Sequence, residues 1–257
     1  MVDRIEYMIN GVKYRLISDL HTHTTFSHGK GSIEDNVLAA RSKGVMKLGI
    51  ADHGPGHIGF GINRKDIPLM RAEVERLKTE YPDMEILLGI EANIVNSSGI
   101  LDVKPEEFKD FDYVIAGYHY GVIGENPITT SAAIVKNFAE EKMGRYTKRL
   151  RRVNTQKVVK SLYENDIKIL THPGDKAPVD LLEIAVACAE TNTLVELNTH
   201  HYSLTEDDLR TMSLADIKYV ISSDAHKPNR VGDFFGAVEL ALSSGIDMSK
   251  IVNLEIE

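Results

Sequence analysis

The stretch Arg15–His28, R-L-I-S-D-L-H-T-H-T-T-F-S-H, decides how the rest of the chain is interpreted. Its first part is apolar with a β-branched residue inside it, which predicts a short buried strand. Side chains alternate along a strand, so Asp19, His21 and His23 are expected to project to one side. His28 follows after a turn and can fold back toward them. Imidazoles converging at a strand end with a carboxylate behind them indicate a metal site. Taken alone, the pattern fits surface histidines beside a loop equally well.

Length and composition bound the fold and the compartment. A chain of 257 residues with 42% hydrophobic residues is long for an ordinary domain but normal for one α/β barrel with a sizeable core. We therefore expect a single domain over residues 1–257. No apolar run reaches the roughly 18 residues of a membrane span, and the N-terminus lacks the form of a signal peptide. The one cysteine, Cys188, lies in an apolar helical pattern, which predicts a buried thiol and a cytoplasmic protein.

The charge distribution is uneven. A formal net charge of −8 argues against a general polyanion binder, so nucleic acid is not an expected partner. Residues 136–160, however, hold nine of the 30 Lys and Arg residues and only two acids. Within them Arg145, Arg149 and Arg152 recur at spacings of four and three, which predicts one helical face. This face is either a solvated surface or a set of guanidinium groups that clamp a phosphate.

Apolar runs and amphipathic stretches alternate along the chain. The predicted strands lie near residues 14–20, 46–51, 85–91, 112–118, 167–171, 193–198 and 218–223. The predicted helices lie near 33–43, 66–80, 155–165, 179–191, 205–214 and 233–245, with only a short helical turn over 104–112. Alternation of this kind predicts a parallel sheet, here a distorted (β/α)7 barrel closed or nearly closed by seven strands.

In such a barrel the active site lies at the carboxyl ends of the strands. Metal-ligating side chains follow six of the predicted strands: His21, His23, His28; Asp52, His53; Glu91; His119; His172; and Asp224, His226. The remaining strand, near 193–198, is followed by Glu196, Asn198, His200 and His201. Seven of the ten histidines thus fall at the same end of successive strands, and this arrangement favours the metal site over surface histidines.

The motifs D-L-H-T-H, A-D-H-G-P, G-I-E-A-N, A-G-Y-H, T-H-P-G and S-S-D-A-H occur in this order between Ser18 and Gly245. In this the chain resembles the PHP (polymerase and histidinol phosphatase) superfamily, and within it the stand-alone phosphatases with a trinuclear zinc centre. The resemblance implies a distorted seven-stranded TIM-like barrel, in agreement with the strand count above. It also implies a hydrolase that acts on phosphoric ester bonds.

The resemblance implies three divalent metal ions and the residues that hold them. The first set is His21, His23, Glu91 and Asp224; the second is His28, His53 and His226; the third is Glu91, His119 and His172. Glu91 would bridge two ions. The ions are expected to be Zn²⁺, with Mn²⁺ or Fe²⁺ as alternatives. Metal-bound hydroxide would attack the phosphorus of a small phosphorylated metabolite, so that no side-chain nucleophile is required.

Several roles and functions stay open at this point. Asp19 is a candidate partner for a ligand imidazole or a bound water, or else a cap near the strand end, while Asp52 is expected to be structural. Asn198 and His200 are candidate substrate contacts. Histidinol phosphatase is an alternative to a broader phosphomonoesterase, and a phosphodiesterase or nuclease is a further one. A regulatory protein with a degraded site would require missing ligands, and none is missing. Assembly into a homo-oligomer is left open.

Overall fold

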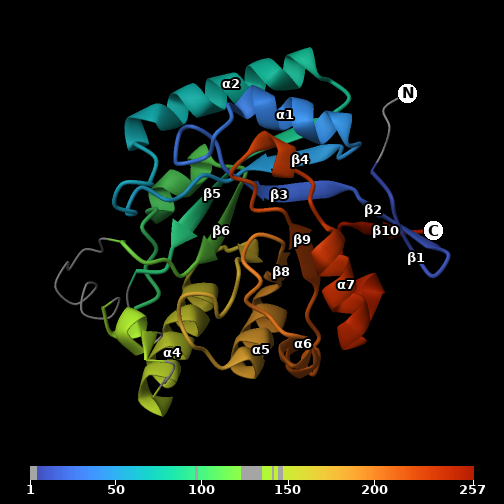
Figure 1. The fold of residues 1–257 in the computed structure, drawn as a ribbon. Coiled ribbons are helices and arrows are strands. Elements are labelled where there is room, and N and C mark those ends of the chain that lie inside the picture. The colour runs from blue at the N-terminus through green and yellow to red at the C-terminus, as the bar shows by residue number, and fades with distance from the viewer. Residues whose placement is uncertain (1–4, 96–97, 123–134, 141, 144–146) are drawn as a thin grey trace.

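The computed structural model describes residues 5–95, 98–122, 135–140, 142–143 and 147–257. Its centre is a parallel seven-stranded sheet whose strands follow one another in chain order and curve into a nearly closed barrel (Figure 1). The strands are β3 (Ser18–Thr22), β4 (Lys47–Ile50), β5 (Glu85–Asn93), β6 (Tyr113–Gly117), β7 (Ile169–Leu170), β8 (Leu194–Asn198) and β9 (Tyr219–Ser222). The expected α/β barrel with seven strands is confirmed.

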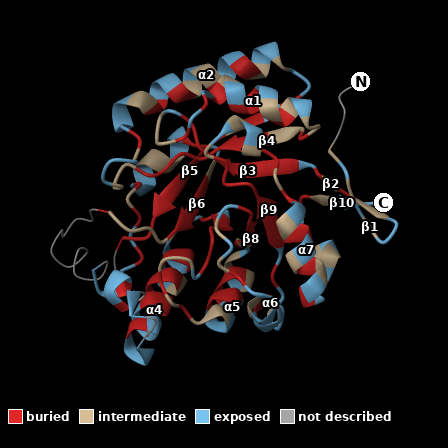
Figure 2. Cartoon of the chain, viewed as in Figure 1, coloured by how far each residue is buried: buried red, intermediate tan, exposed pale blue. Residues whose placement is uncertain are grey.

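Helices surround the barrel and cover it from outside (Figure 1). They are α1 (Ile33–Ser42), α2 (Ile67–Glu80), α4 (Lys148–Glu164), α5 (Leu181–Thr191), α6 (Glu206–Met212) and α7 (Phe235–Ser244). Short 3-10 helices in the described part of the chain lie between these elements: η1 (Arg64–Asp66), η2 (Pro105–Asp110), η3 (Pro228–Arg230) and η4 (Met248–Lys250). In Figure 2 the barrel strands are mostly buried, whereas each helix buries one face and exposes the other. The short turn expected over 104–112 is η2.

Local capping explains where helices begin. The Ser32 hydroxyl accepts from the backbone N–H of Asp35 (3.0 Å), and the Asp35 carboxylate accepts from that of Ser32 (2.8 Å), which starts α1 at the expected place. Thr147 likewise caps α4 by accepting from the backbone N–H of Leu150 at 3.2 Å. Helix α4 therefore begins about two turns before the predicted position, because Leu150 is buried within a run whose other residues are basic.

The first predicted strand, over 14–20, is two strands in the structure. Strand β2 (Val12–Leu16) pairs antiparallel with β1 (Tyr7–Ile9) and with β10 (Leu254–Ile256) in a separate three-stranded sheet. After Ile17 the chain enters the barrel as β3. Neither β1 nor β10 was expected, because both are short and their pairing joins the two ends of the described chain.

The barrel closes where β3 meets β9. A parallel bridge joins Thr22 to Ala225, and the backbone N–H of His23 donates to the Ala225 carbonyl at 2.9 Å. Across the same seam the Asp19 carboxylate accepts from the backbone N–H groups of Ser223 (3.1 Å) and Gly232 (2.8 Å). Asp19 thus bonds main-chain groups and no ligand imidazole. These contacts do not support a role for Asp19 in holding a ligand imidazole.

Apolar side chains fill the space between the sheet and the helices, and a second apolar cluster fills the interior of the barrel. Leu20, Ala51, Ile115, Ile169 and Val220 form the inner cluster. Cys188 is fully buried between α5 and the sheet, and burial raises the pKa of its thiol to about 12, as expected for a core thiol. Among the described helices, none has the length and apolarity needed to cross a membrane.

Candidate metal centre

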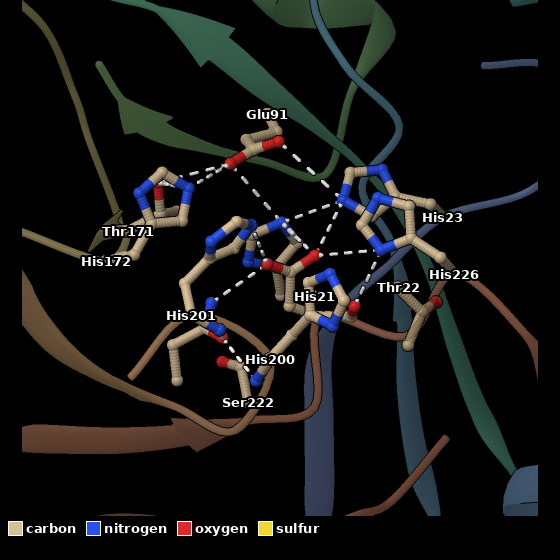
Figure 3. A network of polar contacts seen from close by, with 12 residues as sticks. His21, Thr22, His23, Glu91, Thr171, His172, His200, His201, Ser222 and His226 are labelled. Carbon is tan, nitrogen blue, oxygen red and sulfur yellow. Dashed lines mark hydrogen bonds and ion pairs between the residues drawn. The ribbon is translucent and has the colours of Figure 1, made fainter. Parts of the chain in front are cut away.

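The carboxyl ends of the barrel strands bring the predicted ligands into one cluster. Figure 3 shows His21, His23, Glu91, His172 and His226 among them. Glu91 at the end of β5 is fully buried and lies at its middle. Its Oε2 is 2.6 Å from Nδ1 of His53, and its Oε1 is 3.0 Å from Nε2 of His172. The same Oε1 is 3.2 Å from Nε2 of His119 and 3.4 Å from Nε2 of His21. One carboxylate therefore faces four imidazole nitrogens from four strand ends.

His21 and His23 approach each other on the β9 side of Glu91. Their Nε2 atoms are 3.1 Å apart, and Nε2 of His23 is 3.0 Å from Oδ1 of Asp224. Neutral imidazoles carry one N–H each, so two ring nitrogens that face each other this closely require a shared proton or a cation between them. His119 and His172 repeat this arrangement, with Nε2 atoms 3.2 Å apart.

A second group of rings lies toward the outer edge of the cluster. The ring centroid of His28 is 4.8 Å from that of His53 and 4.2 Å from that of His226. His23 also reaches this group, since its ring lies 4.4 Å from those of both His53 and His226. Potential ligand atoms come within 4.8 Å of one another in three sets: His23, His53, His226; His21, His23, Glu91; and His53, Glu91, His119.

These sets contain only predicted ligands but divide them differently from the expectation. The set expected as His28, His53 and His226 contains His23 instead of His28 in the structure. The set expected as Glu91, His119 and His172 contains His53 instead of His172. The nine residues are therefore brought together, while the assignment of each to one ion stays a prediction.

The outward-facing nitrogens of three imidazoles are held by partners. Nδ1 of His21 donates to Oε1 of Glu196 at 2.8 Å, and Nδ1 of His119 to Oδ1 of Asn93 at 2.7 Å. Nδ1 of His226 donates to the backbone carbonyl of Asp224 at 2.9 Å. Such partners select the tautomer that leaves the other nitrogen free for a metal ion. Asn93 was not singled out from the sequence, although it lies two residues after Glu91 and so faces the same side of β5.

The donor set fits metal ions. Five buried atoms of predicted ligands make no hydrogen bond of acceptable geometry among the described residues: Nδ1 of His23, His28 and His53, Oε2 of Glu91 and Oδ1 of Asp224. Two of them, Nδ1 of His53 and Oε2 of Glu91, nevertheless lie 2.6 Å apart. Buried polar atoms are normally paired, so unpaired atoms that converge on one place are explained by a ligand. Imidazole and carboxylate together suit Zn²⁺, Mn²⁺ or Fe²⁺.

The pKa shifts of His28, His119 and Glu91 favour the forms that bind metal. Burial lowers the pKa of His28 to about 3, helped by the nearby His226 and His53. Burial likewise lowers the pKa of His119 to about 4, against the opposing effect of Glu91. For Glu91 itself burial raises the pKa, but His119, His21 and His53 outweigh it and hold the carboxyl well below its usual range. Burial also lowers the pKa of His21 and His172, but the surrounding carboxylates outweigh it and raise both values above the usual range. Because metal binds the neutral imidazole, these two rings would release their protons when an ion binds.

The candidate substrate contacts Asn198 and His200 differ in how far they are free to bind a substrate. The Asn198 amide donates to Glu196 (2.9 Å) and Asp224 (3.1 Å), and its oxygen accepts the backbone N–H groups of His200 and His201. Asn198 therefore supports the site and has little capacity left for a substrate. His200 is exposed and its ring lies 4.9 Å from that of His226, so it remains at the mouth of the cluster (Figure 3).

The arginines suggested as a phosphate clamp belong to helix α4 and the segment before it. Arg145 lies outside the described residues, while Arg149 and Arg152 are exposed. Arg152 lines a surface hollow together with Arg151, Lys148, Asp180, Glu183 and neighbouring side chains of α4, and no predicted metal ligand lines it. The exposure of Arg149 and Arg152 is compatible with a solvated surface, and the phosphate clamp stays a prediction.

Comparison with known proteins supports the family that the sequence motifs indicate. The sequence pattern of the PHP domain matches residues 19–200, more than half of the chain. The chain belongs to the PHP domain family.

Relatives and solved structures agree with this family. A probable phosphatase of Shewanella frigidimarina is 27% identical over 255 residues, covering 93% of this chain and 89% of the relative. The probable phosphatase YcdX of Escherichia fergusonii is 26% identical over 251 residues, covering 92% and 89%. The fold is similar to that of a histidinol phosphatase candidate from Listeria monocytogenes, with a TM-score of 0.63 at 17% identity over 85% of this chain and 98% of that chain. Histidinol phosphate phosphatase of Lactococcus lactis, solved with zinc, L-histidinol and phosphate, has a TM-score of 0.55 at 16% identity over 90% and 94%.

Proposed function

We propose that this protein is a metal-dependent phosphatase that hydrolyses a small phosphomonoester. The observation that carries the proposal is the position of Glu91, a fully buried carboxylate whose two oxygens face imidazole nitrogens from four other strand ends at 2.6 to 3.4 Å. Membership of the PHP domain family and the names of the curated relatives support the same reaction.

The proposed centre holds three divalent ions, with Zn²⁺ as the first candidate. Glu91 would bridge two of them, and the remaining ligands are the eight other predicted residues. When bound, such ions supply Lewis acidity and lower the pKa of a water molecule so that it becomes a nucleophile at neutral pH. Three divalent ions carry more positive charge than Glu91 and Asp224 neutralise, so the site attracts a phosphate dianion even in a chain of net charge −8.

The chain's own residues supply the geometry. Glu196 and Asn93 fix the orientation of His21 and His119 through their Nδ1 atoms. Burial of Glu91 and Asp224 keeps water from competing for their oxygens. Because the nucleophile is a water molecule, the buried thiol of Cys188 has no role in the reaction.

Hydrolysis of an activated aryl phosphate by purified protein, with and without a chelator, tests the proposal. We expect turnover that a chelator abolishes and Zn²⁺ or Mn²⁺ restores, with monoesters hydrolysed faster than diesters because the dianion matches the cationic site better. A preference for diesters or for nucleic-acid ends would contradict the proposed reaction.

Histidinol phosphate is the narrower candidate substrate. The Lactococcus lactis protein of similar fold was solved with L-histidinol and phosphate, which makes histidinol phosphate the first specific metabolite to test. A cytoplasmic location, a single domain over residues 1–257 and the oligomeric state stay predictions.

A further inference from the structure

The loop of residues 54–61, which we name the rim loop, follows the ligand His53 and is held in a defined shape. The backbone N–H of Ile58 donates to the Gly121 carbonyl (2.7 Å), and that of Gly56 donates to the Asp102 carboxylate (2.8 Å). Gly59 adopts φ +82°, a conformation that favours glycine. Side chains on this loop are therefore presented at fixed positions beside the metal centre.

Two of these side chains are apolar and exposed. Ile58 keeps 60% of its surface in solvent and Phe60 keeps 47%. One side of Phe60 packs against the rings of His28 and His57, with centroids 4.6 and 5.1 Å away. A single exposed apolar residue needs no explanation, but two on one pinned loop beside a polar centre form a surface suited to an apolar group.

Phe60 also belongs to a group of four rings that extends from the metal centre, since it contacts both His28 and His57. His57 stacks on His53 at 5.3 Å with planes 29° apart, and His53 stacks on His28 at 4.8 Å with planes 12° apart. His28 in turn contacts Phe60 with planes 36° apart. A phosphate held beside His28 and His53 would therefore direct its ester group outward past a surface of aromatic rings.

We propose that the rim loop is the binding site for the leaving group and that this group carries a planar, uncharged aromatic ring. Phe60 supplies the stacking face and Ile58 an apolar edge. Aromatic rings attract one another at centroid separations of 4.5 to 7 Å beyond the effect of buried area, which an alkyl group does not match. The proposal rests on the proposed phosphatase function and names the class of substrate for it.

Phenyl phosphate and ethyl phosphate test this preference in the metal-loaded enzyme. Phe60→Ala should lower kcat/KM for phenyl phosphate roughly three- to tenfold more than for ethyl phosphate, mainly through KM. Phe60→Leu keeps apolar area without a ring and should recover only part of the loss. The control is Leu69→Ala on α2, where the side chain is 61% exposed. Equal losses for both substrates would overturn the proposal.

A binding experiment separates this proposal from the reaction itself. The chain contains no tryptophan, so Phe60→Trp introduces a single tryptophan at the rim loop, which can be excited selectively above the absorption of tyrosine. We expect phenylphosphonate, which is not hydrolysed, to change its fluorescence at concentrations where methylphosphonate does not, and Leu69→Trp to respond to neither. No response to phenylphosphonate in a variant that hydrolyses phosphomonoesters would overturn the ring site alone. A response in a protein that hydrolyses none would overturn the proposed function alone.

The same surface could instead be a contact between two copies of the chain. Sedimentation of wild type and Phe60→Ala distinguishes the two explanations. A dimer that the variant loses, together with unchanged selectivity between phenyl and ethyl phosphate, would overturn the ring site. An identical oligomeric state in both proteins, with altered selectivity, supports it.

Discussion

Nδ1 of His21 lies 2.8 Å from Oε1 of Glu196, and Nε2 on the opposite side of the ring faces Oε1 of Glu91 at 3.4 Å. The imidazole thus stands between two fully buried carboxylates from two different strands. Glu196 also accepts the backbone N–H of His172 at 2.8 Å. One residue of β8 therefore holds two predicted ligands, although it is not predicted to contact metal itself.

Replacement of Glu196 by Gln should weaken metal binding without removing a predicted ligand. The amide cannot accept from His21, His172 and Asn198 together as the carboxylate does. Partners of this kind typically change metal affinity by about 10–100-fold. Metal retained after dialysis against a graded chelator measures the effect, with Glu183→Gln on the exposed face of α5 as control. Unchanged metal retention would show that Glu196 does not position His21.

Glu91→Ala should be the most damaging change in the cluster. It removes a ligand from two of the proposed ions and leaves the surrounding positive charge uncompensated. We expect metal content to fall below the three equivalents proposed for wild type and turnover to fall at least about a hundredfold. Elemental analysis and aryl phosphate hydrolysis are the measurements. Glu85→Ala, at the exposed start of the same strand, should retain both; near-normal turnover of Glu91→Ala would refute the bridging role.

Asp102→Asn should loosen His119 from a distance. The Asp102 carboxylate accepts from both the backbone and the side-chain N–H of Asn93, at 2.7 and 2.6 Å, and so fixes the amide whose oxygen holds His119. An asparagine offers one acceptor fewer, which leaves a buried N–H group unpaired at a cost of about 1–3 kcal/mol. We expect faster metal release to a chelator and a lower urea midpoint. A variant with only the stability loss would limit Asp102 to a structural role.

Asp19→Asn should affect stability and spare the metal centre. The carboxylate joins β3 to the segment after β9 by accepting from Ser223 and Gly232, and it bonds no imidazole side chain. A free energy of unfolding lower by about 1–3 kcal/mol is expected, with full metal content under native conditions. Urea unfolding measures the free energy of unfolding, and elemental analysis measures the metal content. Loss of metal from the folded variant would restore the ligand-holding role.

Arg149→Ala and Arg152→Ala should leave KM for a phosphomonoester within about twofold of wild type. Both side chains are exposed on α4, and no predicted metal ligand lines the hollow that contains Arg152. Steady-state kinetics at low ionic strength, where any charge effect is largest, is the stringent test. A several-fold rise in KM for either variant would favour the clamp.

Much of the site could be predicted from the sequence because local rules specify it. Apolar runs that alternate with amphipathic stretches predict a parallel barrel, and a parallel barrel collects its carboxyl ends at one face. His53, Glu91 and His119 could therefore be assigned to one centre although 66 residues separate the first from the last. No contact between strands had to be known for this step.

The tertiary structure alone decided which side chains touch. Alternation predicts that Asp19 shares a face with His21, but the pairing of β3 with β4 shifts register between Asp19 and Thr22, and the carboxylate instead reaches the seam with β9. The pairing of β2 with β10 and the contact of Phe60 with His28 are equally non-local. Periodicity specifies the face on which a residue lies, whereas the neighbour it meets depends on register, bulges and closure between segments distant in the chain.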